Sequence, residues 1–280
     1  MLVIFSGGSG VGKNTVIAEI LKTGGFALMP TYTTRDKRPT ESEGNPYCFL
    51  TDAEFKQKIA ENELYEYENV HGHYYGTSKL LLKQKLALGK ILLKDIDVLG
   101  TQNLVKSVGK DVKIVTLFLK VASKDVLVQR LTERKETEIE KRLARYELEM
   151  SYSDKYDYII TNNYLEETKN LVLDIIEAEK NGLNFGVLDG QTADREKVNF
   201  YVKKLLSGET LSPIVVEFIK GKQYIAEGKE KYLAGLISGQ RVAKDIKNLS
   251  AADLPADIPD QTEWNKTLSE IKGSNNGNNK

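Results

Sequence analysis

The feature that most constrains the fold lies at the start of the chain, where an apolar run leads directly into a glycine-rich segment. Leu2 to Phe5 are all apolar, the glycines at positions 7, 8, 10 and 12 follow at once, and apolar residues then recur at helical spacing from Val16 to Leu21. A continuous apolar run is typical of a strand buried on both faces, as in parallel sheets whose strands are connected by helices. This strand, turn and helix predict an α/β fold.

Further apolar runs of strand length support the same fold class. They cover Ile91–Leu93, Ile114–Leu119 and Tyr158–Ile160, with helical patterns between them. A last helix is expected over 165–180, and Asn181-Gly182 is a plausible stop. We therefore predict a domain over 1–182 with a central parallel sheet flanked by helices.

The remainder of the chain has a different pattern and predicts a small α+β domain over 186–249. Helices are expected over 195–207 and 230–238, strands over 214–218 and 223–226, and a turn at 220–222. From Ser250 onward the sequence is rich in Ala, Asp and Pro, and it ends in Gly, Ser and Asn. We expect 250–280 to be a linker and a disordered tail.

Composition excludes several classes of function. Lys plus Arg and Asp plus Glu both number 40, so the chain has no net charge and nucleic acid is not expected as a partner. No apolar stretch reaches the roughly 20 residues of a membrane helix, which predicts a cytoplasmic protein with no membrane partner. Cys48 is the only cysteine, and no Cys or His spacing predicts a metal site; His71 and His73 are expected on a surface hairpin.

The glycine-rich segment has the spacing of a phosphate-binding loop. Gly7 to Lys13 match the pattern G-x-x-x-x-G-K directly after the first strand. Such a loop presents backbone N–H groups and a helix N-terminus to the phosphates of a nucleotide, and its lysine reaches the terminal phosphates. The alternative is a glycine-rich turn without a ligand. The expected ATP-binding residues here are Gly8, Ser9, Gly10, Val11, Gly12, Lys13, Asn14 and Thr15.

One position departs from this pattern. Asn14 stands where the pattern has a Ser or Thr hydroxyl for Mg²⁺. We expect the ion to be held instead by nucleotide oxygens, water and a carboxylate, since Mg²⁺ usually keeps several waters.

A series of motifs follows the loop in a fixed order. The series comprises Thr33-Thr34-Arg35 with Arg38, Gly44 with Tyr47, Glu66-Tyr67, Gly72 to Thr77, and Asp95-Ile96-Asp97. With these motifs the chain resembles the guanylate kinases over about 2–180. The resemblance implies a P-loop kinase fold with a GMP-binding subdomain, and transfer of the γ-phosphoryl of ATP, with Mg²⁺, to GMP or dGMP.

The resemblance also assigns the residues of the acceptor site. It places Arg35, Arg38, Tyr47 and Tyr75 on the acceptor phosphate, Thr31 and Thr77 on guanine O6, and Asp95 and Asp97 facing the phosphates and Mg²⁺. Glu66 matches the residue that reads guanine. A carboxylate can accept hydrogen bonds from N1–H and the 2-amino group of guanine, which adenine does not offer at that edge.

The region expected to close over the phosphates matches less well. Residues 130–138 are shorter than the family's lid and lack its two glycines. Arg134, Arg142 and Arg145 still match arginines that neutralise the transferring phosphate, and Asn162 matches an asparagine beside the donor adenine. With Lys13, Arg35 and Asp95, these arginines are the expected catalytic residues. Lys94 is a cation where the family usually has an apolar residue.

Other interpretations remain open. Single arginines, tyrosines and acids are more often solvated surface residues, and Arg145 has Glu149 as an i,i+4 partner. The chain is alternatively a kinase for another or modified nucleotide, or a guanylate-kinase-like binding module without catalysis. The C-terminal segment resembles the ParB/sulfiredoxin-like domain from Leu205 to Ala234, but Lys231 replaces its arginine. Its partner is unknown, and Gly228 with Lys231 is a candidate anion site.

Overall fold

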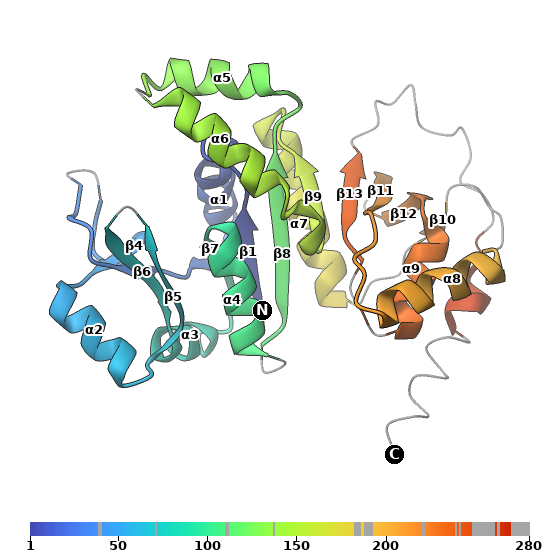
Figure 1. Cartoon of the computed structure of the whole chain (residues 1–280), viewed down its shortest axis with the longest axis horizontal. Helices are drawn as coiled ribbons and strands as arrows, with labels where there is room; N and C mark the ends of the chain where they lie inside the picture. The colour runs from blue at the N-terminus through green and yellow to red at the C-terminus, as the bar shows by residue number, and fades with distance from the viewer. Residues whose placement is uncertain are drawn as a thin grey trace. The chain divides into compact units, whose positions relative to one another are not determined.

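The fold is described from a computed structural model. It covers residues 1–38, 41–70, 72–109, 112–136, 138–181, 186–187, 193–219, 222–238, 240, 242–247, 261 and 264–269. The chain forms two compact units, Met1–Leu117 and Phe118–Lys280, and each is described by itself (Figure 1). The division falls inside strand β8 (Ile114–Lys120). The predictions made for His71, Gly182, the centre of the 220–222 turn, 250–260 and 270–280 lie outside the described residues.

In its described residues, the first unit contains seven strands before β8 and four helices. The strands are β1 (Leu2–Ser6), β2 (Phe26–Leu28), β3 (Thr31–Thr33), β4 (Tyr47–Phe49), β5 (Leu64–Val70), β6 (His73–Ser78) and β7 (Ile91–Asp95). The helices are α1 (Lys13–Lys22), α2 (Asp52–Ala60), α3 (Lys79–Leu86) and α4 (Val98–Val108).

The central sheet of this unit is parallel, as the apolar runs predict. β1 pairs in parallel with β7, and β7 with β2. Every residue of β1 is buried, and Leu2 and Ile4 form a core with Leu82 of α3 and Leu104 of α4. In Figure 1, α4 lies in front of β1 and β7, and α1 lies behind them. This two-sided cover explains why the strands are apolar without alternation.

A second, smaller sheet follows the order β4-β3-β6-β5. β5 and β6 form an antiparallel hairpin in which Asn69 Oδ1 accepts a hydrogen bond from the amide of Gly72, whose φ of 85° favours glycine. Helix α2 covers the sheet, and the ring of Phe55 stacks on Tyr74 with centroids 5.2 Å apart. This small sheet carries most of the residues expected to bind the acceptor nucleotide.

The described residues of the second unit contain further helices and strands. Its helices are α5 (Lys124–Glu133), α6 (Ile139–Met150), the 3₁₀ helix η1 (Ser153–Lys155), α7 (Leu165–Asn181), α8 (Arg195–Leu206) and α9 (Lys229–Ser238). Its strands after β8 are β9 (Tyr158–Thr161), β10 (Gly186–Val187), β11 (Ile214–Ile219), β12 (Lys222–Glu227) and β13 (Lys244–Lys247).

The C-terminal strands join β9 in one sheet. β13 pairs in parallel with β9, with Lys244 opposite Tyr158, and β11 pairs in parallel with β13. Lys120 at the end of β8 also contacts Asp245 of β13 at 3.3 Å. Helices α8 and α9 and strands β11 and β12 lie close to where the pattern predicts them, whereas β10 and β13 were not predicted. The pairing of β13 with β9 is a long-range contact that no local pattern indicates. The division into domains 1–182 and 186–249 stays a prediction.

Part of the tail differs from the prediction of disorder. Residues 264–269 are helical, and the side chains of Trp264 and Leu268 are each 4% exposed. The ring of Trp264 lies 6.3 Å from that of Tyr232 in α9. Trp264 and Leu268 are four positions apart, so they lie on one face of the helix, and their burial stabilises it although the surrounding segment is polar.

The packing of Trp264 can be tested by fluorescence, because the sequence contains one tryptophan. We expect its native emission to lie at shorter wavelength than after unfolding, and to be weakly quenched by acrylamide. Tyr232→Ala should raise the quenching toward the unfolded value. Tyr164→Ala, at a side chain that is 67% exposed in the same unit, should leave it unchanged. Strong quenching of the native wild-type protein would contradict the buried position.

None of the helices in the described part of the chain is long and apolar enough to cross a membrane.

Candidate functional site

The glycine-rich loop closes around the ammonium group of Lys13. Lys13 Nζ donates hydrogen bonds to the carbonyls of Gly7 and Gly8, at 2.6 and 3.1 Å. Gly12 precedes α1 with a φ of 99°, and Gly7 has a φ of 122°, values that L side chains rarely adopt. The loop thus has the backbone of a phosphate cradle at the N-terminus of α1, with its lysine in place.

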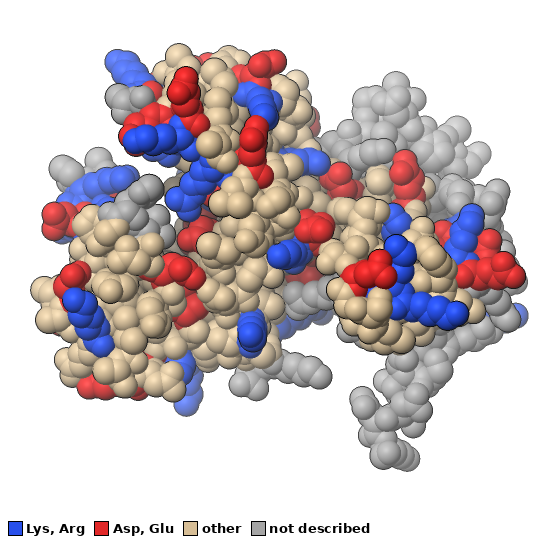
Figure 2. All heavy atoms as spheres, viewed as in Figure 1, with Lys and Arg blue, Asp and Glu red and all other residues tan. Residues whose placement is uncertain are grey.

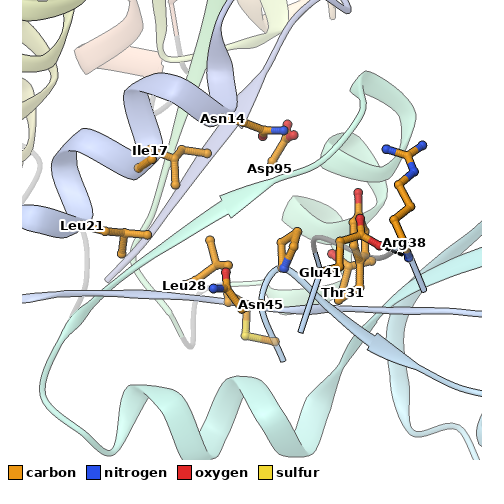
Figure 3. Close-up of a pocket in the computed structure, with 13 residues that line it drawn as sticks. Asn14, Ile17, Leu21, Leu28, Thr31, Arg38, Glu41, Asn45 and Asp95 are labelled. Carbon is orange, nitrogen blue, oxygen red and sulfur yellow. Dashed lines mark hydrogen bonds between the residues drawn. The ribbon is translucent and has the colours of Figure 1, made fainter. Parts of the chain in front are cut away.

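A pocket of about 310 Å³ opens beside α1. Of the residues predicted for nucleotide binding, it is lined by Asn14, Thr31, Arg38, Tyr47 and Asp95. Figure 3 shows Asn14 and Asp95 at one part of this pocket and Thr31, Arg38 and Glu41 at another. Arg35, Glu66, Tyr75, Thr77 and Asp97 are not among its lining residues, although they belong to the same unit.

Asp95 at the end of β7 faces the lysine of the loop. Its Oδ1 lies 3.9 Å from Lys13 Nζ. Burial raises the pKa of Asp95, and the positive charges of Lys13 and Lys94 oppose that rise. Asp97 has a different environment, because its Oδ1 accepts hydrogen bonds from the amides of Leu99 and Gly100, both at 2.9 Å, and so caps α4.

The arginines expected on the acceptor phosphate meet an unexpected acid. Arg35 donates to Glu41 Oε1 at 2.8 Å. The amide of Arg38 donates to Glu41 Oε2 at 2.9 Å, as Figure 3 shows. The hydrogen bond to Glu41 raises the pKa of Arg35, and the same bond lowers the pKa of Glu41. A carboxylate therefore holds the position that an anionic group would take between these donors. Sequence reasoning missed Glu41, although an acid three residues after Arg38 was a visible signal.

Two tyrosines, Tyr47 and Tyr75, lie beside Arg35. The guanidinium of Arg35 lies 5.0 Å from the ring centre of Tyr47, and the rings of Tyr47 and Tyr75 are 6.1 Å apart. Stacking on an aromatic face holds a guanidinium in a fixed orientation. Three of the four residues predicted for the acceptor phosphate are thus in one cluster, and Arg38 joins it through its backbone; its side chain points away from Glu41 in Figure 3.

The residue predicted to read guanine lies in a buried polar group. Glu66 is 7% exposed, and the hydroxyl of Thr77 donates a hydrogen bond to Glu66 Oε1. Burial raises the pKa of Glu66, while the charge of Lys94 and the bond from Thr77 oppose that rise. Gly100 lies against this carboxylate, because a Cβ there would be 3.5 Å from Glu66 Oε2 and 2.9 Å from Ile96.

Lys94 is the second charged residue of the buried cluster that contains Glu66 and Thr77. Its side chain is 0% exposed, and its Nζ donates to Thr31 Oγ1 at 2.7 Å. Burial lowers the pKa of Lys94 to about 8, with the negative charges of Glu66 and Asp95 opposing the shift. The two carboxylates thus favour the charged form of the ammonium group, against the effect of burial.

The predicted lid and adenine residues belong to the second unit. Arg142 contacts Glu136 Oε2 at 2.7 Å, and Arg145 contacts Glu149 at 3.1 Å in an i,i+4 pair. Arg134 ends α5 as its exposed C-cap residue. On the face drawn in Figure 2, charges of both signs alternate over α5 and α6, where these arginines lie. The pairing of Arg145 matches the surface alternative, so the roles of the three arginines stay predictions.

Asn162 directly follows β9 and is 5% exposed. Arg130 of α5 donates to the carbonyls of Asn162 and Asn163, at 2.9 and 3.3 Å. Sequence reasoning missed this contact. The only local signal was an arginine on a helix, which is usually solvated, and the contact joins residues 32 positions apart.

The donor set suits Mg²⁺ bound mainly through water and phosphate. Within the described part of the chain, no group of three His, Cys, Asp or Glu side chains is placed to hold an ion. Asp95 and Asn14, each with a side-chain oxygen, both line the pocket beside the loop. One or two protein oxygens are what Mg²⁺ takes in nucleotide sites, so these residues fit the ion.

The comparisons with known proteins agree with the geometry of the site. The family model described as guanylate kinase matches residues 1–179. A guanylate kinase of Bartonella henselae is 39% identical over 181 residues, covering 64% of this chain and 81% of that protein. One of Fusobacterium nucleatum is 38% identical over 179 residues, covering 63% and 95%.

A solved structure gives the same result. The crystal structure of guanylate kinase from Anaplasma phagocytophilum matches with a TM-score of 0.52 at 28% identity. The match covers 64% of this chain and 85% of that one. These comparisons confirm the fold predicted for the first part of the chain, and the ParB/sulfiredoxin-like assignment of the C-terminal segment stays a prediction.

Proposed function

This chain belongs to the guanylate kinase family, and on that premise we propose that it transfers the γ-phosphoryl group of ATP to GMP or dGMP, giving ADP and GDP or dGDP. The observation that carries the proposal is the buried carboxylate of Glu66 in the same unit as the closed loop around Lys13 and the Arg35 cluster. A base-reading acid, an anion site and a phosphate cradle are the three parts that such a reaction needs.

The chemistry requires positioning and charge neutralisation rather than a covalent intermediate. The acceptor phosphate replaces the Glu41 carboxylate on Arg35, and Tyr47 and Tyr75 donate to its oxygens. Lys13 exchanges its carbonyl partners for the terminal phosphates of ATP. An oxygen of the acceptor phosphate then attacks the γ-phosphorus in line, while ADP departs on the opposite side.

Mg²⁺ fits this site through Asp95 and Asn14. When bound, the ion would neutralise charge on the phosphates of ATP. The carboxylate of Asp95 would orient the waters of the ion, and its 3.9 Å separation from Lys13 keeps both groups at the same end of the site.

The proposal is tested by ADP release from Mg·ATP on the full chain, with GMP, dGMP, AMP, UMP, dTMP and CMP as acceptors. We expect turnover with GMP and dGMP alone. Turnover with AMP would contradict the role of Glu66. Absence of ADP release with all six acceptors would contradict the proposed GMP kinase activity. It would favour a modified nucleotide as acceptor, or a binding module without catalysis.

The acceptor-phosphate cluster makes a separate prediction. Arg35→Ala should raise the KM for GMP by about 10²-fold, because a charge-assisted pair to the phosphate is lost. The KM for ATP should change little. Lys37→Ala, at an exposed cation two residues away, is the matched control and should behave as the wild type. An equal rise of both KM values would show that Arg35 supports the fold rather than the acceptor phosphate.

A further inference from the structure

Lys94 has an environment that a purely structural lysine would not need. It extends the apolar run Ile91–Leu93 of β7, pairs in register with Ile4 of β1, and is fully buried. Burying an ammonium group is costly unless it is paired and hydrogen-bonded. The structure gives it a 2.7 Å hydrogen bond to Thr31 and the nearby charges of Glu66 and Asp95.

The hydrogen bond from Lys94 determines how Thr31 can act. An ammonium group only donates, so Thr31 Oγ1 must be the acceptor in this bond. The hydroxyl proton of Thr31 is then directed elsewhere, as a donor. Because Thr31 lines the pocket whereas Lys94 does not, that proton is available to a ligand and the ammonium is not.

The second hydroxyl near Glu66 is that of Thr77, and it has a different hydrogen-bond partner. Thr77 donates its proton to Glu66 Oε1, so it cannot also donate that proton to a base. Thr31 is thus the hydroxyl of this group whose proton remains for a carbonyl oxygen. A carbonyl at the 6-position of a purine accepts such a proton, whereas a 6-amino group presents a donor to a donor.

We propose that Lys94 is a positioning residue that holds Thr31 as a hydrogen-bond donor to the 6-oxygen of the acceptor purine, and so contributes to selection of 6-oxo over 6-amino acceptors. The inference rests on the proposed function. Glu66 accepts hydrogen bonds from N1–H and the 2-amino group, and Thr31 would donate one to the 6-oxygen. The base would thus be recognised by one acceptor and one donor. Lys94 acts through Thr31, without contact to the base.

The competing role for Lys94 is that of a counterion for Glu66 alone. In that case its removal would weaken the reading of N1–H and the 2-amino group, and leave the 6-oxygen unaffected. The two roles therefore differ in which substituent of the purine becomes less important when the ammonium is removed.

The experiment compares three acceptors in the full chain: GMP, 6-thio-GMP and IMP. 6-Thio-GMP keeps N1–H and the 2-amino group but has a weakly accepting sulfur, and IMP keeps the 6-oxygen but lacks the 2-amino group. In Lys94→Met we expect kcat/KM for GMP to fall by about 10- to 10²-fold, mainly through KM. The preference for GMP over 6-thio-GMP should shrink by a similar factor, and the preference for GMP over IMP should not change.

Lys90→Met, at an exposed lysine directly before β7, is the matched control and should keep both preferences. Thr31→Val should reduce the preference for GMP over 6-thio-GMP by the same factor as Lys94→Met. The double variant should reduce this preference no further than either single variant, because both substitutions remove the same hydrogen bond. Should Lys94→Met fail to fold, Thr31→Val with Lys94→Leu gives the same comparison.

An unchanged preference for GMP over 6-thio-GMP in the folded variants would overturn the inference. So would a change confined to IMP, which would assign Lys94 to Glu66. Absence of GMP turnover in the wild-type protein would instead contradict the proposed function, so the two failures are distinguishable.

Discussion

Replacing Lys13 by alanine is expected to lower kcat for phosphoryl transfer by about 10³-fold or more, with the fold retained. Lys13 Nζ is the cation at the centre of the glycine-rich loop, 2.6 Å from the carbonyl of Gly7 and 3.9 Å from Asp95. In the transition state it neutralises charge that develops on the transferring group. Alanine removes this charge without adding bulk, and α1 keeps its buried face.

The measurement is ADP release at saturating GMP and ATP, together with thermal unfolding of the variant. Lys22→Ala is the control, because Lys22 lies in the same helix with 69% of its side chain exposed and pairs with Glu19 on the surface. It should retain wild-type kcat. A Lys13→Ala variant that is folded and turns over normally would contradict the assignment of the phosphate cradle.

The second large effect is expected from Glu66→Gln. The amide keeps one acceptor but places a donor against the donors of guanine, so kcat/KM for GMP should fall by about 10²- to 10³-fold. Gln has nearly the volume of Glu, and position 66 is only 7% exposed, so the variant should keep the packing of the site. The preference for GMP over AMP should shrink by a similar factor.

These values come from initial rates with GMP and AMP at fixed ATP. Glu61→Gln, at an exposed acid before the same strand, should keep the preference for GMP. If Glu66→Gln were to lower the rates with GMP and AMP equally, Glu66 would be a structural residue and the base would be read elsewhere.

Patterns that act over a few residues made much of the first unit predictable. The apolar runs at Leu2–Phe5 and Ile91–Leu93 became β1 and β7, and the Gly7–Lys13 spacing became a loop around the lysine. These features depend on side-chain periodicity and on the φ angles of glycine, both of which are properties of short segments. The order of the motifs predicted Lys13, Arg35 and Glu66 as site residues, and all three belong to the first unit.

Contacts between distant residues could not be obtained in this way. Lys94 and Thr31 are 63 positions apart, and no local pattern in the sequence predicts their hydrogen bond. The same holds for the pairing of β13 with β9. In the sequence, Arg130 and Glu41 are indistinguishable from ordinary surface charges. Only the structure shows that they contact Asn162 and Arg35. Trp264 lies in a polar segment, and its ring is 6.3 Å from that of Tyr232 in another helix.

The sequence by itself determined the α/β class, the phosphate loop and the family, because each is encoded in spacing along the chain. Only the tertiary structure decided which donor faces which acceptor: Glu41 lies on Arg35, Thr77 donates to Glu66, and Lys94 donates to Thr31. The physical reason is that the direction of a hydrogen bond depends on the position and charge of both partners. In a buried site these are set by strands and helices brought together from far apart in the chain.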